Sequence, residues 1–235
     1  MVRMAEYLSK KQNAKKERGF CLRCHRSPLT CQCKNILSFD PKIRFVILIH
    51  VREAQKRIAT GRLAHLCLEN SLLLPGYDYS DHKELNALLA DPQYHPVILY
   101  PGPGSLNLNQ VEVKAIFPPG KKPLLFVIDG TWTTARKTLQ RSKNLQKIPK
   151  ICFTPKSISK FHVLRRQPEA HFFSTIEAIH ETIELLAPAV GFDTSQKKHD
   201  ILLQVFYRMV EQQLELSRGP KRKGTAPKNN AEQNA

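Results

Sequence analysis

The sequence lacks any long apolar run. No stretch of its 235 residues approaches the roughly 18 to 20 consecutive apolar residues that a membrane-spanning helix needs. The first residues are polar and basic, without the apolar centre of a secretory signal. We therefore expect a chain that stays in the cytoplasm and has no membrane partner.

Acidic residues are also scarce. Asp and Glu total 20 against 37 Lys and Arg, which gives a formal net charge of +17, well beyond the roughly 2 to 8 units of an ordinary small domain. Basic side chains that neutralise phosphates release counterions and so favour a polyanionic partner. A basic surface without a partner is the alternative, and no basic amphipathic helix with a large apolar face favours an anionic membrane. The charge therefore predicts a nucleic-acid partner.

The cysteines are concentrated near the N-terminus of the chain. Four of the six cysteines fall in the pattern C-x2-C-x6-C-x-C, which fits one tetrahedral ion, and zinc prefers such closed sets of thiolates. Four thiolates complete the shell, so the predicted role is structural. Four unligated thiols or an iron–sulfur cluster are the alternatives. The nine histidines, in contrast, are scattered, and their spacing predicts neither a metal pair nor a catalytic dyad.

The composition divides the chain into four segments, without internal repeats. Residues 1–19 form a basic arm, residues 20–40 contain the cysteine knuckle, and residues 41–216 have the apolar content of one main domain. Residues 217–235 contain no large apolar side chain, so they cannot offset their ordering entropy and are expected to be disordered.

Short apolar runs alternate with helical patterns in the main domain. The runs are rich in β-branched and aromatic residues and are bounded by Pro, Gly or polar residues, as buried strands are. Such alternation predicts an α/β fold with a mostly parallel sheet and helices on both faces. Residues 105–123 stay unassigned. The predicted strands are Phe45–Ile49, Val97–Tyr100, Leu124–Ile128 and Ile151–Phe153, and the predicted helices are Arg62–Leu73, Lys83–Ala90, Thr133–Ser142, Ser174–Leu186 and Asp200–Leu216.

The strongest candidate for a functional loop follows the apolar run LLFVI. Ligands of parallel sheets lie beyond the carboxyl ends of the strands, which is where this run places Asp129. Gly130 permits close backbone approach, and Thr131 can cap the next helix. Trp132, the only tryptophan, can stack on a base or on adenine. The alternative is that Asp129 is an ordinary helix cap and Trp132 a core residue.

Three further segments carry weaker signals. Pro101–Gly104 lets the backbone approach a ligand, or is a plain turn. Thr60–Arg62 opens a helix whose N–H groups can receive an anion, or is a simple helix start with an exposed Arg. Ser174–Glu177 fits the capping box S-x-x-E, which local structure explains fully. Arg165 and Arg166 can bind phosphate or be solvated.

Taken together, these motifs resemble those of the DTW-domain family, the tRNA-uridine aminocarboxypropyltransferases. The resemblance covers roughly Cys21 to Leu216, and its most specific part is the D-x-T-W core in Asp129–Lys137. Several separated motifs in the right order are stronger than any one of them. The other matching segments are the four cysteines, Thr60–Leu63, Leu99–Gly102, Leu164–Arg165 and Ser174–Ala178.

The resemblance implies a fold related to the knotted SPOUT methyltransferases, and leaves open whether this chain is knotted. It implies that loops at the strand ends hold S-adenosylmethionine. It further implies that the 3-amino-3-carboxypropyl arm, instead of the methyl group, is transferred to N3 of a tRNA uridine, with release of methylthioadenosine.

By the same resemblance, Asp129 is the candidate catalytic residue, either as the general base for the N3 proton or as a group that orients the base or a water. Arg62 is expected to hold the cofactor's carboxylate. The implied pocket residues are Thr60, Arg62, Pro101, Gly102, Thr131, Trp132, Ser174 and Glu177; the implied contacts to the tRNA backbone are Arg136, Lys137, Arg165 and Arg166; and the zinc ligands are Cys21, Cys24, Cys31 and Cys33.

Two other functions stay open at this point. One is a SPOUT-type RNA methyltransferase that uses the same cofactor, and the other is a zinc-knuckle RNA-binding protein without catalysis. The released product, methylthioadenosine or S-adenosylhomocysteine, distinguishes the methyltransferase from the aminocarboxypropyltransferase. The binding protein is expected to bind RNA tightly and salt-sensitively, without affinity for S-adenosylmethionine. The sequence does not specify which tRNA, which uridine or which oligomeric state.

Overall fold

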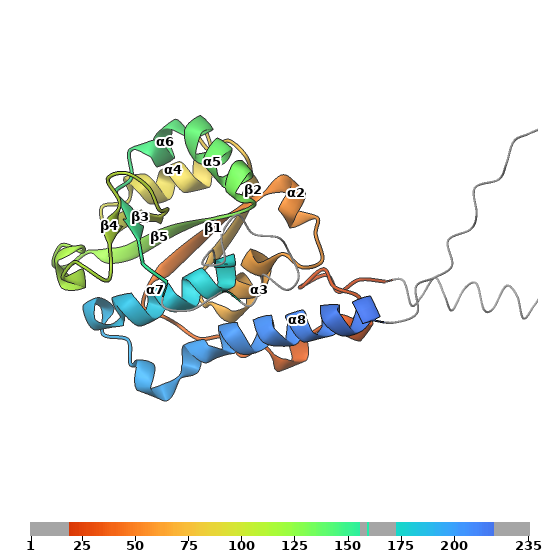
Figure 1. The fold of residues 1–235 in the computed structure, drawn as a ribbon. Helices are drawn as coiled ribbons and strands as arrows, with labels where there is room; N and C mark the ends of the chain where they lie inside the picture. Colours follow the sequence, from red (N-terminus) through yellow and green to blue (C-terminus); the bar gives the residue numbers. More distant parts are fainter. Residues whose placement is uncertain (1–18, 156–158, 160–172, 219–235) are drawn as a thin grey trace, which may run out of the picture.

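One sheet of six strands forms the centre of the computed structural model, which describes residues 19–155, 159 and 173–218 (Figure 1). The strand order is β2-β1-β5-β3-β6-β4, and every pairing is parallel. The predicted parallel sheet is therefore confirmed. The strands are β1 (Arg44–His50), β2 (Leu72–Gly76), β3 (Tyr94–Leu99), β4 (Leu106–Asn107), β5 (Lys122–Asp129) and β6 (Lys150–Cys152).

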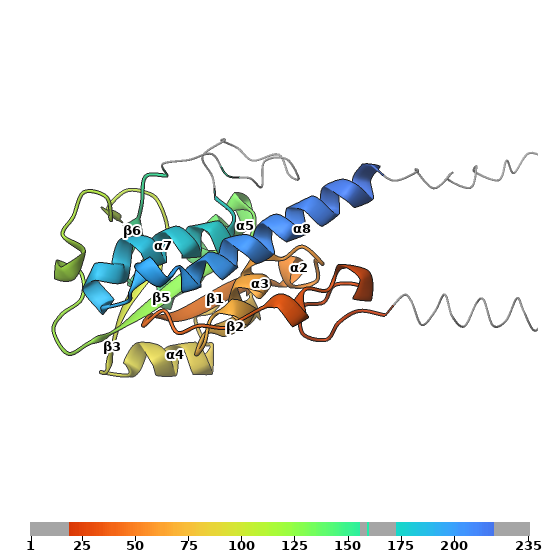
Figure 2. The same ribbon diagram turned by 90° about the horizontal axis from the view of Figure 1, so that it is seen from below.

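Helices cover both faces of this sheet (Figures 1 and 2). Because β1 is buried on both faces, its apolar residues form a continuous run. Phe45 and Ile47 point into one core, and Val46 and Leu48 into the other. The first core is covered by α3 (Thr60–Cys67), α7 (Thr175–Val190) and α8 (Ile201–Arg218), and the second by α4 (Lys83–Ala90), α5 (Trp132–Arg141) and α6 (Lys143–Gln146).

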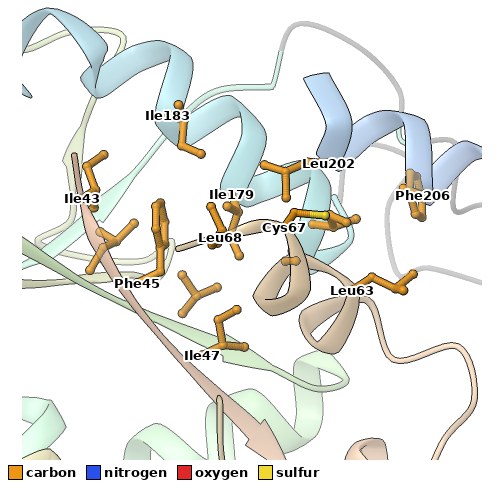
Figure 3. Close-up of a cluster of buried hydrophobic side chains, with 14 of the residues drawn as sticks. Ile43, Phe45, Ile47, Leu63, Cys67, Leu68, Ile179, Ile183, Leu202 and Phe206 are labelled. Carbon is orange, nitrogen blue, oxygen red and sulfur yellow. The ribbon is translucent and has the colours of Figure 1, made fainter. Parts of the chain in front are cut away.

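The core under α7 and α8 joins distant parts of the chain (Figure 3). Side chains of β1 meet Leu63 and Cys67 of α3, which in turn lie beneath α7 and α8. This packing fixes the first turn of α3 against the sheet, close to the strand ends. The labelled members are Ile43, Phe45, Ile47, Leu63, Cys67, Leu68, Ile179, Ile183, Leu202 and Phe206.

The predicted helix Arg62–Leu73 is wrong in its second half. Helix α3 ends at Cys67, and the chain turns at Asn70, whose φ is +56°. The hydroxyl of Ser71 donates to the carbonyl of Leu68 at 2.9 Å and closes this turn. The following apolar residues pair with β1 as strand β2, because a parallel neighbour satisfies their backbone groups. Strand β4 lies in the segment that the sequence left unassigned.

The predicted helix Lys83–Ala90 is confirmed with its bounds, and the other predicted elements are confirmed with shifted ends. Helix α7 continues beyond the predicted end to Val190, and α8 continues to Arg218, so the first two residues of the predicted tail are helical. Residues 1–18, Arg165, Arg166 and the tail from residue 219 lie outside the described residues. Within the described part of the chain, no helix has the length and apolar content to cross a membrane.

Candidate active site and cysteine cluster

Asp129 is the last residue of β5 and lies at the carboxyl edge of the sheet. Its carboxylate receives two hydrogen bonds from two helix starts. The backbone N–H of Gly61, in the first turn of α3, donates to Oδ2 at 3.2 Å, and the hydroxyl of Thr175, the first residue of α7, donates to Oδ1 at 2.6 Å. The positive ends of both helix dipoles favour a negative charge here. One buried carboxylate thus joins three elements.

Gly61 is a glycine because Asp129 lies so close to it. A Cβ at position 61 would lie 2.4 Å from Oδ2 and 2.7 Å from Cγ of Asp129. These distances are well inside van der Waals contact, so a larger residue would displace the carboxylate. The glycine of the T-G-R segment therefore serves close packing against the candidate catalytic residue.

The charge state of Asp129 is set by opposing effects. Burial raises the pKa of its carboxyl, and the negative charge of Glu53 raises it further. The hydrogen bonds from Thr175 and Gly61 and the positive charge of Arg62 oppose this rise, because they stabilise the carboxylate. The net shift is upward, so Asp129 binds a proton more readily than an exposed aspartate.

Arg62 is held by the loop that precedes α3. Its buried guanidinium donates to the carbonyl oxygens of Ala54 and Lys56, the latter at 3.3 Å. Burial lowers the pKa of Arg62, whereas negative charge on Asp129 and Cys24 raises it. The side chain thereby closes the loop after α2 (Val51–Ala54). Its predicted contact with the cofactor's carboxylate stays a prediction.

The D-G-T-W segment turns the chain from β5 into α5. Thr131 is the N-cap, and its hydroxyl accepts the N–H of Thr134 at 3.1 Å. A Cβ on Gly130 would lie 2.6 Å from Oγ1 of Thr134, which explains the glycine. Trp132 is the first residue of α5 and is half-buried. The predicted cap is thus confirmed, and the alternative that Asp129 caps this helix is wrong.

Exposed basic residues border this edge. Arg136 and Lys137 are both exposed on α5. Burial raises the pKa of Tyr100, and the positive charge of Arg136 opposes that rise, so Arg136 lies close to the end of β3. The adjoining Pro101–Gly104 turn is exposed as well. This edge therefore combines positive charge with an open loop.

Ser174 and Glu177 form the predicted capping box at the start of α7. Oε2 of Glu177 accepts the Ser174 N–H at 2.9 Å, the Ser174 hydroxyl at 2.6 Å and the Ser159 hydroxyl at 2.7 Å. Ser174 and Glu177 are both buried, as is Thr60 at the start of α3. These contacts order the first turn of α7, whose Thr175 bonds Asp129. Direct binding of a cofactor by Ser174, Glu177 or Thr60 stays a prediction.

The four N-terminal cysteines come together as predicted. Their sulfur atoms all lie within 4.8 Å of one another, with Cys21–Cys33 and Cys24–Cys31 each at 3.7 Å, and none forms a disulfide. A tetrahedral zinc ion with bonds of roughly 2.3 Å holds its sulfurs about 3.8 Å apart. The sulfur positions therefore fit a zinc ion.

Local backbone contacts shape this cluster. The pKa of Cys21 is lowered to about 6, mainly because its sulfur accepts a hydrogen bond from the backbone N–H of Cys24. Burial instead raises the pKa of Cys24 and of Cys33. The buried Arg26 donates to Oε1 of Gln212 on α8 at 2.9 Å. Four thiolates around zinc carry two net negative charges, so the guanidinium also offsets charge.

Two contact residues of Asp129 were not among the predicted site residues, although the N–H groups of Thr60–Arg62 were expected to receive an anion. Gly61 lies inside the matched segment Thr60–Leu63, and Thr175 lies inside Ser174–Ala178. The motifs contained the signal, but only the folded chain brings Gly61 and Thr175 to one carboxylate.

The fold and the site define an α/β protein with a candidate catalytic carboxylate at the carboxyl edge of a parallel sheet and a four-cysteine cluster in its N-terminal segment. Residues 18–214 match the family model of the DTW domain. The chain belongs to the DTW domain family.

Curated relatives are similar over most of this chain. They include proteins named tRNA-uridine aminocarboxypropyltransferase 2 from Macaca fascicularis (27% identical, covering 73% of this chain and 57% of the relative), Drosophila melanogaster (28%, covering 72% and 67%) and Mus musculus (24%, covering 71% and 56%). The chain thus spans little more than half the length of two of these relatives. No solved structure gave a significant match.

Proposed function

We propose that this protein transfers the 3-amino-3-carboxypropyl group of S-adenosylmethionine to N3 of a tRNA uridine and releases methylthioadenosine. Membership of the DTW domain family and the names of its relatives support this activity. The observation that carries the proposal is the buried Asp129 carboxylate, held at the carboxyl edge by the first turns of α3 and α7. That edge is where parallel α/β proteins bind their ligands.

The reaction is a displacement at carbon. N3 of the uridine loses its proton and forms a bond to the γ-carbon of the methionine arm. The bond between that carbon and sulfur breaks, and its electron pair neutralises the sulfonium. Methyl transfer requires the same donor and differs only in the carbon attacked, so the protein's task is to align one carbon with N3.

The donor would lie against the loops that follow the central strands. Pro101 and Gly102 follow β3, while Thr131 and Trp132 follow β5, and these two strands are neighbours. The half-buried indole of Trp132 offers a face on which adenine or the target base can stack. A relation of this sheet to the SPOUT methyltransferases is part of the proposal.

Asp129 would receive the N3 proton. Its raised pKa makes it a better proton acceptor than an ordinary aspartate, and both oxygens are oriented by hydrogen bonds. In the alternative role, the carboxylate only orients the base or a water. Asp129→Asn separates the two roles, because an asparagine oxygen can still accept from Gly61 while its amide faces the hydroxyl of Thr175.

The tRNA would approach over the basic side of α5. Arg136 and Lys137 are exposed there, one helical turn from the D-G-T-W segment, and suit contacts to phosphates. Arg165 and Arg166 are proposed for the same role. A uridine in a folded tRNA loop would have to turn outward to reach Asp129.

A structural zinc ion would be held by four thiolates, those of Cys21, Cys24, Cys31 and Cys33. Its role would be to stabilise the N-terminal segment that packs against α8. Each ligand is a cysteine sulfur, so the shell has no place for a substrate. The test is the zinc content of the purified protein compared with that of Cys21→Ser. Loss of zinc and a lower melting temperature in the variant are expected, and equal zinc content would contradict the assignment.

The co-product tests the activity. Purified protein is incubated with S-adenosylmethionine and unmodified tRNA, and the small molecules are separated by chromatography. Methylthioadenosine that forms only in the presence of tRNA is the expected result. S-adenosylhomocysteine would make the protein a methyltransferase. Salt-sensitive tRNA binding without turnover or affinity for S-adenosylmethionine would make it a binding protein.

A further inference from the structure

A second group of metal-ligating side chains lies where α7 meets the start of α8. His180 and Glu184 are one helical turn apart on α7 and so face the same side. His199 and Asp200 belong to the 3-10 helix η6 (Lys198–Asp200), which leads into α8. One donor atom from each of the four lies within 4.8 Å of the other three. The fold thus assembles two imidazoles and two carboxylates from separate elements.

Hydrogen bonds link the four side chains in pairs, so binding an ion requires small side-chain movements that widen the donor distances. His180 Nε2 lies 3.0 Å from Asp200 Oδ1, and His199 Nε2 lies 2.5 Å from Glu184 Oε1 and 3.6 Å from Asp200 Oδ1. A tetrahedral shell with bonds of roughly 2.0 to 2.1 Å separates its donors by about 3.3 to 3.4 Å. The side chain of Glu184 is 42% exposed and that of Asp200 34%, so both can rotate and an ion can enter.

The carboxylates of Glu184 and Asp200 lie close together. Their oxygens lie within 4.8 Å of each other, a separation at which like charges repel. Lys197 and Lys198 are nearby in the chain but exposed, and among the described ion pairs neither joins Glu184 or Asp200. A divalent cation would neutralise both carboxylates at once.

His199 presents a ring nitrogen to this cluster from the interior. Its side chain is completely buried, and among the described residues its Nδ1 has no hydrogen-bond partner. Imidazole nitrogens are common metal ligands. The ring stacks on His180 at 4.7 Å between centroids and meets the edge of Phe192, which fix its orientation.

We propose that His180, Glu184, His199 and Asp200 bind one divalent transition-metal ion, with zinc as the ion to test first. Imidazole ligands favour zinc, nickel or copper over magnesium and calcium. The ion joins α7 to the segment that starts α8, so its role is structural. The site is separate from the cysteine cluster and does not depend on the proposed transferase activity.

An ion at this position would affect both the Asp129 site and the cysteine cluster. Helix α7 holds Asp129 through Thr175 at its first residue, and α8 holds the cysteine cluster through Gln212 and Arg26. A metal between the two helices would fix their relative position. The sequence did not predict this metal site, because His180 and His199 are far apart in the chain. They meet only when α7 packs against the start of α8.

Zinc content tests the proposal. The double variant Glu184→Gln/Asp200→Asn keeps the shape of both partly exposed side chains and removes their charges. After equilibration with zinc chloride and dialysis, the wild type should contain one more zinc ion per chain than the double variant. Zinc should also raise the melting temperature of the wild type more than that of the variant. Glu211→Gln, an exposed change on α8, is the matched control and should behave as the wild type does.

Cobalt identifies which site is filled. Cobalt(II) at four thiolates gives an intense charge-transfer band, whereas cobalt at imidazoles and carboxylates gives only weak visible bands. The double variant should lose the weak bands and keep the thiolate band, and Cys21→Ser should do the reverse. Equal metal content in wild type and double variant, with unchanged cobalt spectra, would show that the four side chains form hydrogen-bonded pairs only and would overturn the proposal.

Discussion

The backbone N–H of Gly61 donates to Oδ2 of Asp129 at 3.2 Å, and a Cβ at position 61 would lie 2.4 Å from that same oxygen. The first turn of α3 is thus close-packed against the Asp129 carboxylate at the end of β5. The arrangement makes the position of Asp129 sensitive to a single methyl group.

Gly61→Ala should therefore displace the carboxylate. We expect a loss of roughly 1 to 3 kcal/mol in the free energy of unfolding, as for other overpacked sites, together with loss of transfer activity. Chemical denaturation measures the first effect. In an Asp129→Ala background the stability loss should shrink, because the two closest atoms are gone. An equal loss in both backgrounds would show that Asp129 is not the obstacle.

Asp129→Asn should lower the transfer rate by about 100-fold or more while the fold is kept, since a general base contributes roughly 10² to 10⁴ in rate. Single-turnover kinetics with tRNA and the donor both saturating measure this rate. A variant that retains a rate within about threefold of the wild type would leave Asp129 an orienting role only.

The same substitution should change how stability depends on pH. Burial raises the pKa of Asp129 in the folded chain, so the folded state holds this proton more strongly than the unfolded state does. The resulting stability is present below the unfolded pKa of roughly 3.9 and is lost as the pH rises through the folded pKa. The stability of Asp129→Asn relative to wild type should therefore be more favourable at pH 7 than at pH 4. The opposite trend in thermal melts would contradict the raised pKa.

Thr175→Val should shift the pH profile of the reaction. The Thr175 hydroxyl lowers the pKa of Asp129 by stabilising the carboxylate, so its removal raises that pKa. If Asp129 acts as the base, the acidic limb of the rate profile moves to higher pH. Thr182→Val is the matched control, because its hydroxyl bonds the Ala178 carbonyl on the same helix. Coincident profiles for both variants would remove Thr175 from this role.

Arg136→Gln and Lys137→Gln should each weaken tRNA binding and reduce its salt dependence. Removing one basic side chain that neutralises a phosphate lowers the slope of log affinity against log salt by about 0.7 to 0.9. Lys147→Gln removes an exposed charge just before β6, at the opposite edge of the sheet, and should leave the slope unchanged. Equal slopes for all three variants would place the tRNA elsewhere.

Much of this fold was predictable because its signals are local. The buried runs of β1 and β5, the cap at Thr131 and the capping box at Ser174 are each determined by neighbours in the sequence. Strand β2 was missed because its leucines follow α3 without a Gly or Pro between them. Only pairing with β1 decides their conformation.

The site was predictable in its motifs but not in its contacts. Asp129 is marked by its place after a buried strand, whereas its partners Gly61 and Thr175 come from distant segments. The contacts of Arg62 were likewise not predictable from the sequence. The sequence suggested a ligand contact for Arg62. In the fold its guanidinium also donates to two backbone carbonyls, and no sequence pattern predicts these two hydrogen bonds.

The most direct test of the proposed reaction uses two labelled donors. One S-adenosylmethionine carries heavy carbon in the aminocarboxypropyl arm, and the other carries it in the methyl group. Each is incubated with the protein and unmodified tRNA, and the digested nucleosides are analysed by mass spectrometry. We predict a uridine that gains mass label from the first donor and none from the second. Label delivered from the methyl donor, with none from the arm, would contradict it.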